Sequence, residues 1–326
     1  MDYPSPHLMP RRYSYAVLLA AVAVGLLVPR LANWLLGPAL LLGMLLLGVA
    51  HGACDQYVVP ATHPLLARER ARYWAGFLGG YLGLAGVVLV LWWRWPALAL
   101  AVFFGLTAWH WGSADAPVAG KHRGQWLAHS LLRGSFLFLV PLWYWPTETQ
   151  AVVNGLLALA GAAPVSAAGY ALTLTWLGPL VLGGHALLWL SYWWQGRAAV
   201  AATDALEVGL LTALLVVLPP VLSAGVYFVF WHSLQHVQRM SELMSGANGE
   251  AVTGRRILAD VGFFLRRSVP LLLISLLALA VLYGLAWTRA ASPSVLLSLA
   301  LLVASVVTLP HALLVTLGMD AARWRR

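Results

Sequence analysis

The chain has 326 residues, of which 61% are hydrophobic and only 10% are charged. Soluble domains contain about 45–50% apolar and about 25% charged residues, so this composition excludes a soluble globular protein and indicates a polytopic membrane protein. The net charge of +9 does not indicate nucleic-acid binding, because the basic residues lie singly or in pairs between apolar runs, as in cytoplasmic loops.

The apolar runs predict an all-α fold, a bundle of about ten membrane-spanning helices in one domain over residues 1–326, with the site-bearing core at 33–317. A span needs about 20 mainly apolar residues. The first run follows two arginines but lacks a clear small-residue cleavage site, so it is expected to be a span and not a cleaved signal peptide. The predicted spans are 13–29, 33–57, 72–93, 96–115, 124–145, 168–194, 203–219, 221–244, 262–287 and 293–317.

The distribution of basic residues predicts the orientation of these spans. With the N-terminus inside, 16 basic residues fall on the cytoplasmic side and three on the opposite side. Cytoplasmic loops carry the excess of lysine and arginine, so both termini are expected in the cytoplasm and the protein in the inner (plasma) membrane. The polar segment 245–256 is expected to be a flexible cytoplasmic loop.

Histidines within the even-numbered spans all fall in the cytoplasmic half under this topology. Polar residues at membrane depth are costly and usually functional, and a neutral imidazole is the commonest protein metal ligand. We therefore expect these histidines to converge on one metal site. They are His51, His110, His185, His232, His236 and His311.

Spacing separates the histidines into probable ligands and supporting residues. His232 and His236, in WHSLQH, lie four residues apart and so share one helix face, which suits two ligands of one metal ion. The alternative is two polar residues that hydrogen-bond to neighbouring helices. His185 and His311 are lone histidines, each of which is a further ligand, a residue that orients a ligand, or a structural residue.

Acidic residues follow two of the histidines. Asp55 lies four residues after His51 in HGACD, and Asp115 lies five after His110 in WHWGSAD. A carboxylate often orients a metal-binding imidazole through its other ring nitrogen, and two carboxylates would offset part of an ion's charge. The spacing does not ensure the contact between His51 and Asp55, so Asp55 is equally suited to orient a different histidine, or to be solvated at a helix end.

Aromatic residues near these histidines suit either an interfacial belt or the walls of a pocket for a flat apolar substrate. Four neutral imidazoles suit iron, copper, zinc or nickel. The single cysteine excludes a disulfide framework and a cysteine-rich zinc site, and the lack of thiolates argues against an iron–sulfur cluster. The candidate substrate-binding residues are Trp109, Trp111, Tyr227, Phe228, Phe230 and Trp231.

HGACD, WHWGSAD and WHSLQH, in this order within polytopic spans, resemble the Brp/Blh family of bacterial and archaeal β-carotene 15,15'-dioxygenases. The resemblance implies cleavage of the central double bond of β-carotene by O2 to give two retinals. It also implies a ferrous ion, Fe(2+), as cofactor, lipid as the source of substrate, and release of retinal toward a rhodopsin. The implied iron ligands are His51, His110, His232 and His236, with no catalytic residue beyond the metal centre.

Two other classes of function remain open at this point. Membrane desaturases and hydroxylases are also histidine-rich, but they use about eight histidines in HxxxH and HxxHH boxes, whereas this chain has one HxxxH and no HH pair. Paired histidines on different helices also ligate haem, and intramembrane histidines and aspartates also line ion paths.

Overall fold

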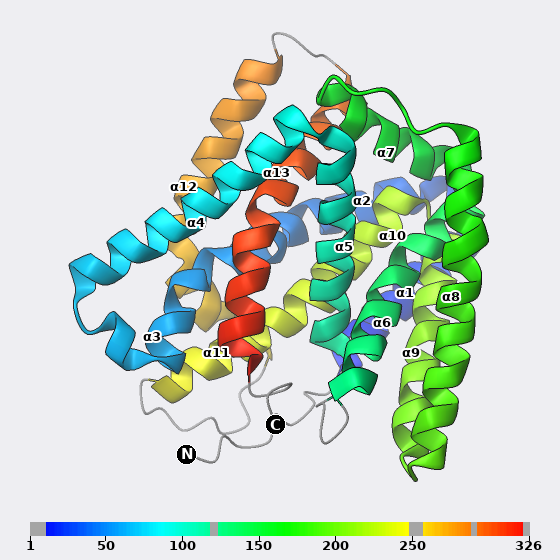
Figure 1. Ribbon diagram of the computed structural model, residues 1–326, viewed down its shortest axis with the longest axis horizontal. Coiled ribbons are helices and arrows are strands. Elements are labelled where there is room, and N and C mark those ends of the chain that lie inside the picture. Colours follow the sequence, from blue (N-terminus) through cyan, green and yellow to red (C-terminus); the bar gives the residue numbers. More distant parts are fainter. Residues whose placement is uncertain (1–10, 118–122, 248–256, 288–291, 322–326) are drawn as a thin grey trace.

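The computed structural model describes residues 11–117, 123–247, 257–287 and 292–321, and these residues form an all-helical bundle (Figure 1). Of the predicted loop 245–256, the first three residues end a helix and the rest lies outside the described residues. The α-helices are α1 (Arg12–Leu27), α2 (Ala32–Gly43), α3 (Val58–Thr62), α4 (Arg70–Arg94), α5 (Pro96–Asp115), α6 (Arg123–Tyr144), α7 (Pro146–Leu159), α8 (Ala167–Trp194), α9 (Ala198–Val217), α10 (Pro220–Val226), α11 (Leu234–Ala247), α12 (Ile257–Trp287) and α13 (Pro293–Leu314).

Prolines and serines mark many of the helix starts. Proline occupies the first helical position of α5, α7, α10 and α13, where its missing N–H leaves no backbone bond unmade. Ser166 caps α8 by accepting a hydrogen bond from the amide of Gly169 at 3.1 Å. Helix α7 occupies part of the stretch between the fifth and sixth predicted spans, for which the sequence pattern indicated no element.

Seven helical segments in the described part of the chain are long and apolar enough to cross a membrane, so the protein is a helical membrane protein. They are Pro29–Thr62, Arg70–Arg94, Pro96–Asp115, Ala167–Trp194, Ala198–Val217, Ile257–Gly284 and Ser294–Met319. The other three predicted spans are also helical: α1 has 16 residues, α6 carries several polar residues, and 220–247 is one continuous helix made of α10, η5 and α11. The count of ten spans stays a prediction.

The outer faces of these helices are apolar, and their polar side chains point inward. Trp93 on α4 is 77% exposed and Trp176 on α8 is 73% exposed, whereas Arg133 on α6 is completely buried. Such an arrangement suits a protein whose surroundings are lipid, because lipid tails solvate apolar side chains and leave buried polar groups to satisfy one another.

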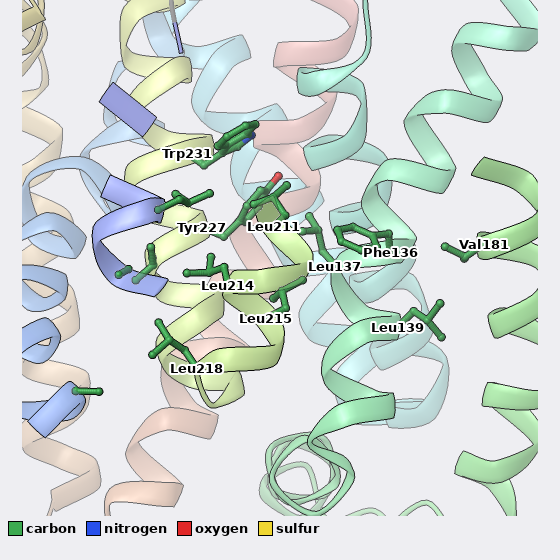
Figure 2. Packing of buried hydrophobic residues seen from close by; sticks show 14 residues of the cluster. Phe136, Leu137, Leu139, Val181, Leu211, Leu214, Leu215, Leu218, Tyr227 and Trp231 are labelled. Carbon is green, nitrogen blue, oxygen red and sulfur yellow. The ribbon is translucent and has the colours of Figure 1, made fainter. Parts of the chain in front are cut away.

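The largest apolar cluster lies between α1, α6, α9 and the π-helical segment η5 (Tyr227–Ser233). The cluster includes Phe136, Leu214 and Trp231 (Figure 2). Leu18 belongs to it as well, and each of these four side chains has at most 3% of its surface exposed. This cluster fixes the position of η5, which carries one of the predicted metal ligands.

Helix α5 lies between α13 and α6, and its contact with α6 is the most extensive between any two elements of the described chain (Figure 1). Two glycines allow this approach. A Cβ atom on Gly112 would stand 1.8 Å from the carbonyl oxygen of Ser130, and one on Gly134 would stand 1.8 Å from that of Ala108. Small residues let transmembrane helices pack backbone to backbone, and this contact sets the position of His110, two residues before Gly112.

We predict that Gly112→Ala lowers the free energy of unfolding by about 1–3 kcal/mol, because its methyl group would overlap backbone atoms of α6. Gly105→Ala, on the same helix, is the matched control, because a Cβ atom added at Gly105 would meet no atom within 4 Å apart from the adjacent backbone of its own helix. That control should leave stability unchanged or raise it by about 0.5–1 kcal/mol, since alanine favours helix over glycine. Thermal unfolding of the detergent-solubilised protein measures both, and equal effects would contradict the packing argument.

Candidate metal centre

Five imidazoles from five different segments meet at one place in the bundle. Neighbouring rings in this cluster have centroids 4.8–5.9 Å apart. The five residues, hereafter the histidine cluster, are His51 on the 3-10 helix η3 (Ala50–Tyr57), His110 on α5, His232 on η5, His236 on α11 and His311 on α13. The structure therefore brings together the four residues predicted as ligands and adds His311 to them.

Most of the ring nitrogens in this cluster are buried without a hydrogen-bond partner among the described residues. Both nitrogens of His110, His232 and His236 are in this state, and so is Nε2 of His311. Burying a polar group unpaired costs about 1–3 kcal/mol, so several orphaned nitrogens at one point need a partner. A metal ion fits this donor set, because it would accept a lone pair from each ring.

The fifth ring, His51, is held by its own backbone. Its Nδ1–H donates to the carbonyl oxygen of Gly48 at 2.5 Å, so in the neutral ring Nε2 carries the free lone pair. This contact arises where the π-helical segment η2 (Met44–Gly48) gives way to η3. A fixed tautomer is what a metal-binding imidazole requires.

Segments of π-helix accompany the cluster at three points. One segment, η2, ends three residues before His51; η5 contains His232; and η6 (Val315–Met319) begins four residues after His311. Such wide turns are rare and are found mostly at functional sites, where they redirect side chains that a regular helix would point elsewhere. The sequence pattern carries no signal for them.

Asp55 orients a different histidine from the nearest one in the sequence. Both carboxylate oxygens lie 2.9 Å from Nδ1 of His311, and the hydroxyl of Tyr81 donates to Oδ2 at 3.1 Å. One ligand atom each from Asp55, His236 and His311 lie within 4.8 Å of one another. Asp55 therefore lies beside the cluster, as expected, but through α13 instead of through its own segment.

Two of the residues considered as supporting candidates lie elsewhere. His185 on α8 donates from Nδ1 to the carbonyl of Val181 at 2.8 Å and packs against Phe136 and Trp189. Asp115 contacts arginines and a tryptophan instead of a histidine. Neither side chain joins the histidine cluster.

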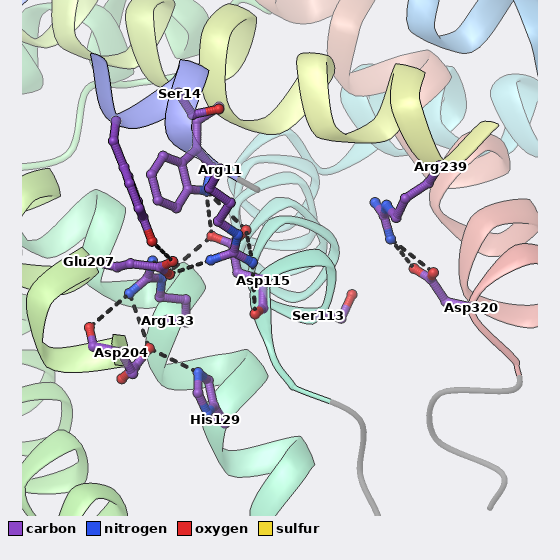
Figure 3. Close-up of polar contacts among 12 residues, drawn as sticks. Arg11, Ser14, Ser113, Asp115, His129, Arg133, Asp204, Glu207, Arg239 and Asp320 are labelled. Atoms are coloured by element: carbon purple, nitrogen blue, oxygen red, sulfur yellow. Dashed lines mark hydrogen bonds and ion pairs between the residues drawn. The ribbon is translucent and has the colours of Figure 1, made fainter. Parts of the chain in front are cut away.

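Asp115 belongs to a buried network of charged residues (Figure 3). Arg133 donates to Asp115 at 3.4 Å, to Asp204 at 3.1 Å and to Glu207 at 2.8 Å. Arg11 pairs with Glu207 as well, and His129 lies 3.1 Å from Asp204. Sequence analysis did not identify this network, although single charged residues inside the apolar runs of α6 and α9 are its signal.

The network connects two of the segments that carry cluster histidines. The indole N–H of Trp231 donates to both oxygens of Asp115, at 3.0 and 2.9 Å. Trp231 directly precedes His232, and Asp115 ends the helix that carries His110. The contact therefore holds η5 in register with α5, and the rings of His110 and His232 lie 4.9 Å apart as a result.

Only some of the candidate aromatic residues reach the cluster. Phe228 stacks on His232 at 6.0 Å and meets His51 edge-on at 5.3 Å, and Trp111 lies 5.8 Å from His232. Phe228 and Trp111, hereafter the aromatic wall, are partly exposed and pack beside His232 of the cluster.

The remaining aromatic candidates have other surroundings. Tyr227 packs on Trp111. Trp109 packs against Trp126, Trp231 binds the charged network, and Phe230 packs into the apolar clusters. The π-helical turn of η5 separates these neighbours in sequence into different environments.

Comparisons with known proteins agree with the motifs. A model of the family described as "BCD: Beta-carotene 15,15'-dioxygenase" matches residues 42–319, which include the whole histidine cluster. "Probable beta-carotene 15,15'-dioxygenase Blh" from Halobacterium salinarum is 29% identical over 301 residues, covering 82% of this chain and 80% of the relative. "Probable beta-carotene 15,15'-dioxygenase Brp" from the same species is 28% identical over 225 residues, covering 65% of this chain and 60% of the relative. The resemblance indicated by the three motifs is thus confirmed. No solved structure gives a significant match.

We predict that Arg133→Met lowers the free energy of unfolding by about 3–5 kcal/mol, because it leaves three buried carboxylates short of a cation. Arg12→Met is the matched control, since Arg12 is exposed and stacks on its neighbour Tyr13. Thermal unfolding in detergent should separate the two variants clearly. Similar stability of both would show that the network contributes little.

Proposed function

Because this chain belongs to the β-carotene 15,15'-dioxygenase family, we propose that it cleaves the central 15,15' double bond of β-carotene with O2 and releases two molecules of retinal. The observation that carries the proposal is the histidine cluster, in which imidazoles from four separate helical stretches face one another and most ring nitrogens are buried and unpaired among the described residues. The names of the relatives supply the substrate.

The proposed cofactor is a ferrous ion held by His51, His110, His232 and His236. Imidazole suits iron among the first-row metals, and the cluster offers no thiolate ligand within the described residues. When bound, ferrous iron supplies the activation of O2 that cleavage of a carbon–carbon double bond requires. The two atoms of O2 then become the two aldehyde oxygens, so no other oxidant or reductant is needed.

The role of the protein side chains in this proposal is to bind and orient the polyene. Phe228 and Trp111 present flat aromatic faces beside His51 and His232, on a partly exposed side of the cluster. An apolar substrate dissolved in lipid would reach that side without crossing water. The buried surroundings of His110 and His236 would keep water from the reacting bond.

The membrane arrangement proposed for this activity follows from the charge distribution. Ten helical segments would cross the inner membrane with both termini in the cytoplasm, and the cluster would then lie in the cytoplasmic half. Retinal released there would pass to lipid or directly to a rhodopsin.

The first test is cleavage in cells that accumulate β-carotene. Expression of the protein should replace β-carotene with retinal, and His110→Ala should abolish this conversion together with bound iron, because it removes one of the converging ligands. His185→Ala is the matched control: it removes a buried histidine that lies outside the cluster, and it should retain both iron and activity.

Labelled oxygen extends this test. Both retinal molecules should carry 18O when the reaction runs under 18O2. Intact β-carotene beside folded, iron-loaded protein would contradict the proposal, and label in only half of the aldehydes would exclude a dioxygenase.

The second test concerns the aromatic wall. Phe228→Ala should lower kcat/KM for β-carotene about tenfold or more, since a fully used aromatic contact contributes about 1.5–3 kcal/mol, while the iron content stays unchanged. Phe103→Ala on α5 is the control, because Phe103 contacts Phe104 and none of the cluster rings. A parallel loss of iron in Phe228→Ala would show a structural role instead of a role in substrate binding.

A further inference from the structure

We infer that His311 is a fifth ligand of the metal in the histidine cluster, and that Asp55 positions it and offsets part of the ion's charge. This inference rests on the proposed metal centre. It goes beyond the four ligands implied by the motifs, since His311 follows a proline in LPHALL and belongs to none of them.

The His311 ring lies among the rings of the proposed ligands. The His311 ring lies 4.8 Å from that of His51, 4.9 Å from that of His110 and 5.3 Å from that of His236. It therefore contacts three of the four proposed ligands, which is as many neighbours as any other ring of the cluster has. A residue that only supports one ligand from behind is not expected to contact three of them.

The two ring nitrogens of His311 have different surroundings. A neutral imidazole has one N–H donor and one lone pair. The Nδ1–H of His311 donates to Asp55 at 2.9 Å, so the lone pair is on Nε2, and Nε2 is buried without a hydrogen-bond partner among the described residues. A carboxylate behind one nitrogen and a metal at the other is the usual setting of a metal-binding histidine.

The carboxylate of Asp55 is buried, since this residue is only 1% exposed. Within the described ranges, four other buried carboxylates pair with an arginine: Asp115, Asp204 and Glu207 with Arg133, and Asp320 with Arg239. Asp55 pairs only with His311 in that part of the chain. A buried carboxylate needs a cation, and a divalent ion bound through His311 supplies one.

The alternative is that His311 and Asp55 form only an ion pair that joins α13 to η3. That alternative and the inference differ in one measurable respect. An ion pair would contribute to stability alone, whereas a ligand also determines the affinity for the metal and the spectrum of its coordination sphere.

The experiment uses Co(II) as the probe, titrated anaerobically into the full-length protein in detergent. His311→Ala should weaken Co(II) binding roughly 10–100-fold or more and change the intensity of the Co(II) d–d bands, because a ligand is lost. Asp55→Asn, which keeps the shape of the side chain, should weaken binding about 10–100-fold. Added imidazole should restore the d–d spectrum of His311→Ala.

His185→Ala is again the matched control. His185 also lies in mid-helix, also donates from Nδ1, and also has a buried Nε2 without a partner among the described residues, but it is outside the cluster. The His185→Ala variant should bind Co(II) with the same affinity and spectrum as the unchanged protein. Thermal unfolding without metal checks that each variant is folded, and His311→Gln replaces His311→Ala if the alanine variant is not.

The outcomes distinguish a wrong fifth ligand from a wrong metal centre. Unchanged Co(II) affinity and spectrum in folded His311→Ala or His311→Gln would overturn the fifth ligand and leave the proposed function standing. Failure of the unchanged protein to bind Co(II) or iron at all would overturn the metal centre and the inference together.

Discussion

The requirement that every polar group in an apolar interior finds a partner governs this molecule. Lipid offers no hydrogen bonds, so buried charges and imidazoles must satisfy one another or bind something else. The charged network around Arg133 meets the requirement within the protein, with carboxylates supplied by α5 and α9. The histidine cluster does not meet the requirement in this way. Most of its ring nitrogens have no hydrogen-bond partner among the described side chains.

The charged network and the histidine cluster are connected through direct contacts. Trp231 donates to Asp115 one residue before His232 in the chain, and close packing of Gly112 against α6 fixes the helix that carries His110. The network therefore holds two segments that carry cluster histidines, and the apolar cluster of Figure 2 includes Tyr227 and Trp231 of the same segment, η5. A site whose side chains must be held within about 0.5 Å benefits from such rigid surroundings.

The sequence predicted the helical class and the convergence of four histidines, namely His51, His110, His232 and His236. Both predictions use the composition and charge of long stretches of chain, which can be read without knowing how the helices pack. Sequence analysis left three roles open for His311, because a lone histidine has no spacing that identifies its role. It paired Asp55 with His51 as one possibility, and the structure pairs it with His311, 256 positions away. It also missed the partners of Arg133, which come from separate helices.

What the sequence determined by itself is therefore a membrane-embedded helical protein, a set of histidines predicted to converge, and the motifs that show its family. The tertiary structure decided which of these histidines meet and which, like His185, do not. Helix rotation, the wide π-helical turns beside the histidines and the glycine contact between α5 and α6 set the direction of each ring. These depend on contacts between segments far apart in the chain, and hydrophobic periodicity says little about them, because apolar residues occupy many inward-facing as well as lipid-facing positions of a membrane helix.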